Sequence, residues 1–241
     1  SVLTRMSVIE LKNGPKTVAL FMDGNRRWAR AHGKSVLEGH EAGKNVVHDF
    51  VEFYPRIRAR WGTKHYIFYA FSTENWNRAP EEVANIMGVF ERAFEEFGNL
   101  LPQLKAADLS IRFIGERERL SGRLRSLMQE LEEKTADRSG TLTLAVSYGG
   151  RADLLEAFRS LARDGSAVTE EAIEDRLSTR GLPPLDLIIR PGGEKRLSNF
   201  LLWEAGYAEI AFTDRLWPDF DEAELELIFA DYARRERRHG R

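Results

Sequence analysis

The sequence of 241 residues predicts an α/β fold with a single domain, in which helices flank a six-stranded, mainly parallel sheet. Three observations predict it. Short apolar runs that end in glycine or turn residues alternate with segments of helical periodicity along the whole chain. No internal repeat or low-complexity linker interrupts this alternation. Polar and basic residues follow several of the apolar runs directly, at the strand ends where ligands of such sheets collect.

The elements are expected in the following order. Residues 1–16 form an N-terminal arm that ends in the turn signal Asn13-Gly14-Pro15, and residues 17–241 form the domain. The predicted strands cover residues 18–22, 66–71, 109–115, 142–146, 185–189 and 208–212. The predicted helices cover residues 25–32, 39–54, 83–101, 119–134, 152–163, 169–178 and 222–235.

The composition narrows the class of protein. A hydrophobic share of 42% is ordinary for a globular domain, and a net charge of −2 gives no field that selects nucleic acid, so no nucleic-acid partner is expected. The chain has no cysteine, which removes disulfides and thiolate metal sites and fits a reducing compartment. No apolar run reaches the roughly 20 residues of a membrane span, and no signal peptide opens the sequence, so a cytoplasmic location is expected.

The stretch 17–30, TVALFMDGNRRWAR, carries the first candidate site. A buried strand ends at Asp23, and Asn25 is a suitable N-cap for the helix that follows. At such a junction the free backbone N–H groups and the positive end of the helix dipole bind anions. The arginines beside the junction strengthen this anion binding. Asp23 repels phosphate unless it holds a Mg²⁺ ion that bridges to the phosphate. The alternative is that Asp23 closes a turn before a solvated basic helix.

Three further segments allow two interpretations each. His40 stands near a helix N-terminus, where it either donates to an anion or caps and packs. The loop 72–80, STENWNRAP, is expected either to close over a ligand or to fold Trp76 back as a plug. The helix 83–101 has a wider apolar arc than one core-facing stripe requires, so it is either buried on two sides or lines an apolar cavity.

A second anion site is predicted where the strand 185–189 runs into RPGGEKRLSNF, residues 190–200. This loop combines two arginines, a lysine, a Gly-Gly turn and a Ser or Asn at a helix start. It is not a P-loop, because Gly-Lys-Ser/Thr in the required frame is missing. The strand 142–146 delivers SYGGR to the same edge of the sheet. The basic segment 234–241, taken alone, is typical of a solvated tail.

Together these features fit a reaction between two phosphate-bearing substrates. Such a reaction accounts for the two anion pockets, the one acid suited to Mg²⁺, the lack of an obvious nucleophile and the excess of apolar helix surface. Mg²⁺ and hydrogen-bond donors stabilise the diphosphate that leaves an allylic substrate. The carbocation then meets an alkene that is held by its own phosphate anchor, and a weak base removes one proton. The growing hydrocarbon needs an apolar tunnel.

Five sequence blocks resemble the signature blocks of the cis-prenyltransferases, a family that includes undecaprenyl diphosphate synthase. The blocks are DGNRRWA, FSTENWNR, SYGGR, RPGGEKRLSNFLLW and YAE…LWPDF, in the family's order between about residues 17 and 240. The resemblance implies an enzyme that condenses isopentenyl diphosphate with an allylic diphosphate, farnesyl diphosphate being the expected primer. The expected product is a Z-polyprenyl diphosphate, undecaprenyl diphosphate by default. Helix 83–101 then lines the tunnel, with Ala70 and strand 142–146 opposite.

The resemblance also implies roles for individual residues. Asp23 is expected to coordinate Mg²⁺, the expected cofactor, and to assist departure of the diphosphate, while Asn75 is the proton acceptor or its organiser. Glu209 is expected to complete the Mg²⁺ site from the partner subunit of a homodimer. The allylic diphosphate is expected to contact Gly24, Asn25, Arg26, Arg27, Trp28 and His40, under a loop formed by Ser72, Thr73, Glu74, Trp76 and Arg78. The isopentenyl diphosphate is expected to contact Arg190, Lys195, Arg196 and Ser198, with Arg238 and Gly240 reaching a neighbouring active site.

Three positions depart from the commoner bacterial pattern of this family. Arg26 stands where Gly is usual, and Thr17 replaces a His at the strand start. Val36 stands where an Arg often helps to bind diphosphate, so one donor is missing from the primer site. A short- or medium-chain product is therefore the alternative to undecaprenyl diphosphate, which serves as a cell-wall lipid carrier. A loose peripheral contact with a membrane is expected for product release.

Three rival functions make different demands on the sequence. A phosphatase with Asp23 as nucleophile commonly has a second carboxylate two residues on, where this chain has Asn25. A non-catalytic partner subunit of a prenyltransferase heterodimer lacks the Asp and the basic loop that this chain keeps. A polyprenyl-binding carrier without turnover has no need of Asn75 or of paired anion sites.

Overall fold

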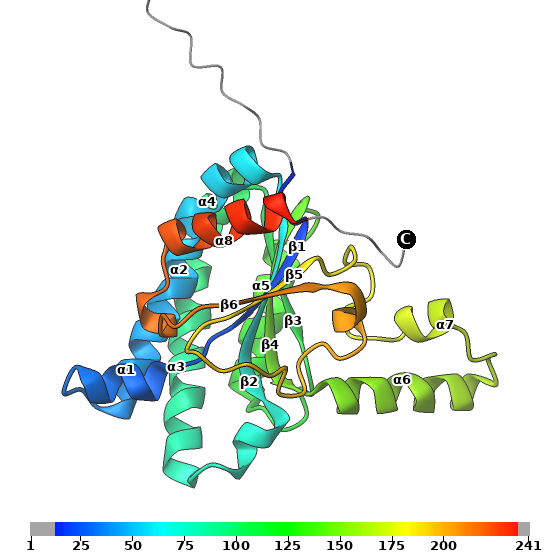
Figure 1. Cartoon of the computed structure of the whole chain (residues 1–241). Coiled ribbons are helices and arrows are strands. Elements are labelled where there is room, and N and C mark those ends of the chain that lie inside the picture. The colour runs from blue at the N-terminus through cyan, green and yellow to red at the C-terminus, as the bar shows by residue number, and fades with distance from the viewer. Residues whose placement is uncertain (1–12, 236–241) are drawn as a thin grey trace, which may run out of the picture.

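The fold is built on one sheet of six parallel strands, seen in the computed structural model of residues 13–235 (Figure 1). The strands lie in the order β3-β4-β2-β1-β5-β6, and every neighbouring pair is parallel. Their bounds are β1 Thr17–Phe21, β2 His65–Ser72, β3 Leu109–Ile114, β4 Gly140–Tyr148, β5 Leu187–Arg190 and β6 Glu209–Phe212. The predicted α/β class with a six-stranded parallel sheet is confirmed.

Helices connect the strands, as the alternating pattern predicts. Their bounds are α1 Asn25–Ala31, α2 Val36–Trp61, α3 Pro80–Asn99, α4 Leu101–Ala106, α5 Gly122–Lys134, α6 Gly150–Asp164, α7 Glu170–Glu174 and α8 Glu222–Arg234. Three short 3₁₀ helices are η1 Thr73–Asn77, η2 Glu204–Tyr207 and η3 Trp217–Asp219. Within residues 13–235, no helix combines the length and the apolar character of a membrane span.

The boundaries differ from the predicted ones where local hydrogen bonds or proline intervene. Helix α2 begins earlier than expected because Ser35 and Glu38 form a capping box, which satisfies N–H groups of the first turn. The predicted helix 83–101 is two helices, α3 and α4, and Pro102 stands in the first turn of the second. A proline there supplies no N–H to continue α3. Ser121 caps α5 by accepting from the Leu124 N–H, so this helix begins after residue 119.

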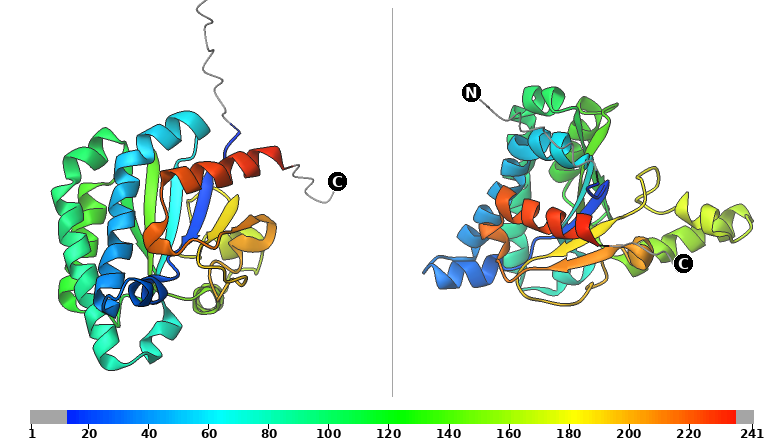
Figure 2. Two further views of the ribbon diagram at one scale, coloured as in Figure 1. Left: turned by 60° about the vertical axis from the view of Figure 1, so that its left-hand side comes forward. Right: turned by 45° about the horizontal axis from the view of Figure 1, so that its top comes forward.

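The main core lies on one face of the sheet. Apolar side chains of α2, α3, α5 and α8 pack there against alternate residues of the central strands, such as Val18 and Leu20 of β1. The opposite face is covered by a smaller cluster around Phe200 and Leu201 from the segment after β5. Helices α6 and α7 project from that side (Figures 1 and 2). Because β1 lies in the middle of the sheet, the residues that follow it are fixed by neighbours on both sides.

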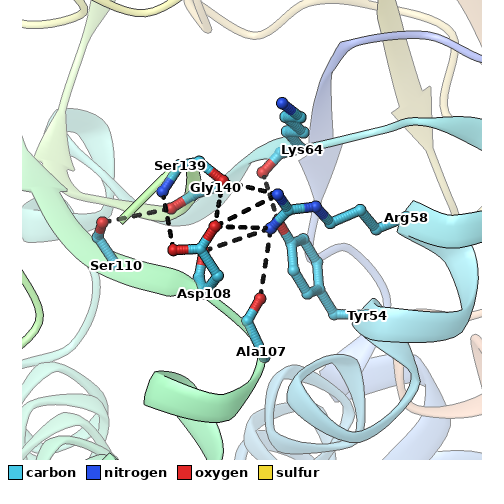
Figure 3. Close-up of polar contacts among 8 residues, drawn as sticks. All are labelled: Tyr54, Arg58, Lys64, Ala107, Asp108, Ser110, Ser139 and Gly140. Carbon is cyan, nitrogen blue, oxygen red and sulfur yellow. Dashed lines mark hydrogen bonds and ion pairs between the residues drawn. The ribbon is translucent and has the colours of Figure 1, made fainter. Parts of the chain in front are cut away.

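A polar network ties the last turns of α2 to the residues that directly precede β2, β3 and β4 (Figure 3). Arg58 of α2 donates to the Asp108 carboxylate at 3.3 Å and to Ser139 Oγ at 2.6 Å. Tyr54 Oη donates to the Lys64 carbonyl at 3.2 Å and lies directly against Gly140, at the start of β4. These contacts hold α2 against the amino-terminal edge of the sheet, opposite the edge at which Asp23 lies.

The close approach of Tyr54 to Gly140 gives the first testable prediction. A Cβ atom on residue 140 would overlap the Tyr54 hydroxyl, so Gly140→Ala is expected to lower the free energy of unfolding by about 1–3 kcal/mol. Gly98→Ala is the control, because no atom lies within 4 Å of the added Cβ, and alanine there is expected to stabilise α3 by up to about 1 kcal/mol. Urea unfolding measures both, and equal effects would contradict the prediction.

Candidate active site

A cavity of about 580 Å³ lies at the carboxyl edge of the sheet and extends between the sheet and the helices α2 and α3. Its polar part contains residues that follow β1, β2 and β5, and its inner part is apolar. The polar residues include Asp23, Asn25, Arg26, Arg27, Arg30, His40, Ser72, Asn75, Arg78, Arg190, Arg196 and Ser198. The apolar residues include Val47, Ala70, Phe71, Ile86, Val89, Phe90, Ala93, Phe94, Phe97, Leu144 and Val146. Three strand ends that are remote in the sequence therefore contribute to one cavity.

Asp23 and Arg190 form a close ion pair at the centre of the polar part. Arg190 Nε and Nη2 lie 2.8 and 2.7 Å from the same Asp23 oxygen, Oδ2. The Arg190 side chain is only 4% exposed, whereas that of Asp23 is 34% exposed. The guanidinium also lies 4.2 Å from the centre of the Phe21 ring. The pair links the ends of β1 and β5, and it leaves the second Asp23 oxygen, Oδ1, without a contact to Arg190.

The predicted role of Arg190 is to contact a substrate, but this side chain makes several hydrogen bonds within the protein. Besides Asp23, it donates through Nη1 to Ser198 Oγ at 2.9 Å and to the Arg196 carbonyl. These bonds hold the loop after β5 in a shape that includes positive φ angles at Ser198 and Asn199. Arg196 lies on this loop and is exposed, so its charge remains available to a ligand although it also pairs with Glu194.

The N-cap of α1 is Gly24 and not Asn25, so the predicted N-cap was wrong by one residue. Gly24 has φ 109° and is the N-cap, with no side-chain hydrogen bond, and Asn25 is the first helical residue. The Asn25 amide lies 3.5 Å from His40 Nδ1, and its Oδ1 is buried without a partner among the described residues. A Cβ on Gly43 would lie 2.5 Å from that oxygen, so glycine in α2 makes room for this side chain.

Trp217 fixes the turn that carries Asp23 from the opposite side. Its backbone N–H donates to the Asp23 carbonyl at 2.8 Å, and its indole N–H donates to the Gly43 carbonyl of α2 at 2.8 Å. The ring is fully buried. A residue near the end of the domain therefore connects the end of β1 to α2.

His40 is neutral at pH 7. Burial lowers its pKa to about 4; Arg78 and Arg26 lower it too, and Glu82 opposes them in part. Nε2 is buried without a hydrogen-bond partner among residues 13–235. A neutral ring in a cavity wall with one unpaired nitrogen is typical of a position that contacts a polar ligand.

This lowered pKa predicts how stability depends on pH. The folded pKa of about 4 lies below the usual 6.5, so the neutral ring contributes stability that is complete above about pH 6.5 and is lost as the pH falls through about 4. His40→Gln lacks this term, so its free energy of unfolding is expected to fall less than that of the parent between about pH 7 and pH 5. Urea unfolding at both pH values measures it, and parallel losses would contradict it.

The segment after β2 is a capped 3₁₀ turn. Ser72 Oγ accepts from the Asn75 N–H, and Asn75 Oδ1 accepts from the Ser72 N–H at 3.1 Å. Trp76 packs against Phe71 and donates to Ser147 Oγ at 2.9 Å, so it is placed as the plug interpretation expects. Asn75 lies in the cavity wall, whereas Trp76 does not.

Of the other residues predicted to contact the allylic diphosphate, some line the cavity and others contact protein groups outside it. Arg78 lines the cavity and pairs with Glu82 at 3.1 Å. Thr73 and Glu74 are not among the residues of the cavity wall, and Glu74 accepts from Asn199 at 2.8 Å. Trp28 likewise lies outside the wall, where its indole donates to Asp219 at 2.7 Å.

Two further expected contacts, Lys195 and Glu209, also lie away from this cavity. Lys195 lies in a separate shallow depression with Phe212 and Arg235. Glu209 begins β6, so it lies at the amino-terminal edge of the sheet, where it pairs with Arg235 at 2.9 Å. Within one chain Glu209 lies far from Asp23, because Glu209 begins its strand whereas Asp23 follows the end of a parallel strand. Arg238 and Gly240 fall outside the described residues.

Sequence reasoning missed two polar residues of the inner wall, Lys44 and His48 of α2. A signal was present, because residues four apart on a helix share a face, and His40, Lys44 and His48 have this spacing. Tyr69 also lines the cavity without having been singled out, and Arg30, one of the arginines of the stretch 17–30, lines it too.

A Mg²⁺ site at this position fits the donors only in part. Among residues 13–235 no group of three or more His, Cys, Asp or Glu side chains is placed to hold a metal. Mg²⁺ is commonly bound by one or two carboxylates together with substrate phosphates and water. Asp23, partly exposed with Oδ1 not held by Arg190, is suited to such a shared site. The residues therefore fit an ion that arrives with a phosphate ligand.

Comparisons with known proteins agree with this geometry. The model of a protein family described as "Putative undecaprenyl diphosphate synthase" matches residues 21–240. An isoprenyl transferase of Chromobacterium violaceum is 41% identical over 98% of this chain and 92% of its own length. A farnesyl-diphosphate-specific ditrans,polycis-undecaprenyl-diphosphate synthase of Acinetobacter baylyi is 42% identical over 98% of this chain and 95% of its own length.

Two solved structures are similar in fold and sequence. The lavandulyl diphosphate synthase of Lavandula x intermedia, in complex with dimethylallyl diphosphate, has a TM-score of 0.88 and 32% identity, over 95% of this chain and 99% of that one. A structure described as a "probable undecaprenyl diphosphate synthase" of Campylobacter jejuni has a TM-score of 0.75 and 31% identity, over 94% of this chain and 99% of that one.

Proposed function

The chain belongs to the undecaprenyl diphosphate synthase family of prenyltransferases, and from this premise we propose that it condenses isopentenyl diphosphate with a short allylic diphosphate to extend a Z-polyprenyl chain. One observation carries the proposal. A single cavity joins a polar end, formed by Asp23 and several arginines, to an apolar end between the sheet and α3. A substrate with a charged head and a hydrocarbon tail matches both ends.

The allylic diphosphate is assigned to the junction of β1 and α1. The Asn25 amide, neutral His40 and the exposed Arg26 line this part of the cavity. Arg27 lines it too, next to Gly192, where a Cβ would lie 2.6 Å from its guanidinium. Charge-assisted hydrogen bonds from arginine suit diphosphate oxygens, and the positive end of α1 adds to them. These donors stabilise the negative charge that develops as the diphosphate leaves.

Bound Mg²⁺ supplies charge neutralisation for the leaving diphosphate. Asp23 is the proposed ligand from this chain, since its carboxylate is partly exposed in the polar end of the cavity. Arg190 orients this carboxylate through Oδ2 and keeps its other oxygen turned to the cavity contents. Glu209 of a partner subunit is the second proposed ligand.

The isopentenyl diphosphate is assigned to the loop after β5. Arg196 and Ser198 line the cavity beside Asp23, so a diphosphate held there lies close to the allylic one. Asn75 faces the same cavity and is held by its bonds to Ser72, which suits the removal or relay of one proton. The hydrocarbon of the allylic substrate is assigned to the apolar part lined by Phe90, Phe94 and Phe97.

A homodimer and a peripheral membrane contact extend the proposal. The edge strand β6 carries Phe212, and the projecting helix α6 carries Leu155 and Phe158, all partly exposed. Apolar surface of this kind suits packing against a second copy. Val36 and Leu37, at the start of α2, are also exposed and suit a loose contact with a membrane at which product is released.

A primer assay tests the proposed function. The protein is incubated with labelled isopentenyl diphosphate, Mg²⁺ and each of three primers, dimethylallyl, geranyl and farnesyl diphosphate, and product lengths are measured. We expect extension of farnesyl diphosphate, with products no longer than a medium-length chain because the cavity volume of about 580 Å³ is that of an ordinary small-ligand pocket. Lack of incorporation with every primer would sink the proposal. Phosphate release from a simple phosphate ester would instead favour the phosphatase alternative.

A further inference from the structure

The motif SYGGR, residues 147–151, follows the same edge of the sheet, but the proposed reaction assigns it no part. Its backbone contacts the loop after β5. The Gly150 N–H donates to the Asn199 carbonyl at 2.7 Å, and the Arg151 N–H donates to Asn199 Oδ1 at 2.9 Å. These N–H groups begin α6, whose N-cap, Gly149, supplies no side-chain hydrogen bond. Asn199 therefore satisfies the first turn of α6 from a distant part of the chain.

The Asn199 side chain also reaches the segment after β2. Its Nδ2 atom donates to Glu74 Oε1 at 2.8 Å, and hydrogen bonds to a carboxylate are stronger than those between neutral groups. Glu74 lies in η1 directly before Asn75, a residue of the cavity wall. Ser198, directly before Asn199, lies in the same wall. One amide side chain therefore joins the segments that follow β2, β4 and β5.

Two glycines leave room for this link. A Cβ atom on Gly149 would lie 2.5 Å from Thr73 Oγ1 and 2.9 Å from Asn199 Nδ2. A Cβ atom on Gly150 would lie 3.1 Å from the Asn199 carbonyl oxygen and 2.8 Å from Leu202 Cγ. A side chain at either position would push the loop after β5 away from η1 or from α6. The contacts of Asn199 thus explain why two glycines stand together after β4.

The backbone that carries Asn199 is held from two other sides. Tyr69 Oη of β2 donates to the Ser198 carbonyl at 3.3 Å, and Arg190 of β5 donates to Ser198 Oγ at 2.9 Å. Asn199 itself has φ 62°, in the left-handed region that asparagine and aspartate adopt more readily than other residues with a side chain. The bond to Glu74 therefore ties η1 to a loop that β2 and β5 already hold.

The proposed condensation depends on the alignment of these two segments. The isopentenyl group is assigned to the loop after β5 and proton removal to Asn75, so the distance between the segments sets the distance between alkene and base. A misplacement of about 1 Å commonly lowers a rate about 100-fold. Arginines assigned to the diphosphates, such as Arg27 and Arg196, lie outside this link. Loss of the link is therefore expected to lower kcat more than it raises KM.

We propose that Asn199 is a positioning residue, which aligns the segment of Asn75 with the isopentenyl loop through its hydrogen bond to Glu74. This inference rests on the proposed function. It gives the motif SYGGR the role of binding Asn199 from the side of β4. It also predicts that the donor and acceptor of the bond matter, rather than the volume of either side chain.

The first test is the variant Asn199→Asp. Aspartate suits the left-handed backbone and keeps an oxygen for the Arg151 N–H, but it places a carboxylate oxygen where the amide donates to Glu74. With farnesyl and isopentenyl diphosphate, kcat is expected to fall about tenfold or more, while KM for each substrate stays within about twofold. Asn99→Asp is the matched control and is expected to keep the parental kcat, because Asn99 is exposed at the end of α3 and lies outside the cavity wall.

A second substitution exchanges the donor and the acceptor of the bond. When Asn199→Asp is combined with Glu74→Gln, the glutamine amide donates to the new carboxylate, so the link is restored in the opposite direction. The kcat of the double variant is expected to recover to at least about half that of Glu74→Gln alone. A general loss of loop structure would not be reversed by a further substitution, so recovery distinguishes positioning from unfolding of the loop.

Hydrogen exchange gives a readout that does not need turnover. Exchange of the backbone N–H groups of residues 72–78, measured by mass spectrometry on the full chain, is expected to be faster in Asn199→Asp and to return toward the parental rate in the double variant. Parental kcat or parental exchange in a folded Asn199→Asp variant would overturn the inference, as would a loss that Glu74→Gln does not reverse. Absence of incorporation by the parent protein would contradict the proposed function, and the exchange rates would still decide whether Asn199 holds η1.

Discussion

Replacing Asp23 by asparagine is expected to lower kcat for prenyl transfer by about 100- to 1,000-fold while the protein stays folded. Asparagine keeps an oxygen that accepts from Arg190, so the link between β1 and β5 is largely retained. It removes the negative charge that the proposed Mg²⁺ site needs, and loss of a group that stabilises developing charge commonly reduces turnover by two to three orders of magnitude. Steady-state kinetics with labelled isopentenyl diphosphate measures the loss.

Asparagine is a sharper probe here than alanine, because alanine also leaves the buried Arg190 without its partner. Glu222→Gln is the matched control, since Glu222 forms an exposed pair with Arg56 at 2.7 Å, far from the cavity wall. Circular dichroism and urea unfolding establish that each variant is folded. A folded Asp23→Asn variant with parental activity would contradict the assigned role.

Arg190→Lys is expected to lower both stability and turnover. The guanidinium contacts Asp23, Ser198 and the Arg196 carbonyl at once, and the flexible ammonium of lysine cannot reproduce this fork. Unpaired buried acceptors then lower the free energy of unfolding by about 1–3 kcal/mol. Since the loop after β5 loses its support, kcat/KM for isopentenyl diphosphate is expected to fall by about 100-fold or more.

The control for this variant is Arg56→Lys, in which the same chemical change is made in an exposed pair with Glu222. Such pairs contribute about 1 kcal/mol or less, so neither stability nor turnover is expected to change noticeably. Equal losses in the two variants would show that the buried contacts of Arg190 have no special role.

The fold could be predicted from the sequence because its signals are local. The apolar runs at 18–22 and 142–146 read as buried strands, and the turn residues after them mark the edge at which the cavity lies. Helix limits were less predictable. The capping box at Ser35 and the break before Pro102 depend on hydrogen bonds and steric limits, and the spacing of apolar residues carries no information on these.

The cavity was partly predictable for the same reason. Asp23, Asn75 and Arg190 each follow a strand directly, and parallel strands bring such positions to one edge. The direction of each side chain was not predictable, because it depends on tertiary partners. Trp76 turns to Ser147, Trp28 turns to Asp219, and Glu209 lies at the far edge, although all three belong to motifs that the sequence singled out.

The contacts of Trp217 with the Asp23 and Gly43 carbonyls have a consequence for biosynthesis. Asp23 leaves the ribosome before the groups that hold its turn, because Arg190 and Trp217 are translated almost 170 and 200 residues later. A nascent chain that lacks these residues cannot assemble the proposed site, so capture of a prenyl substrate there must await synthesis of Trp217.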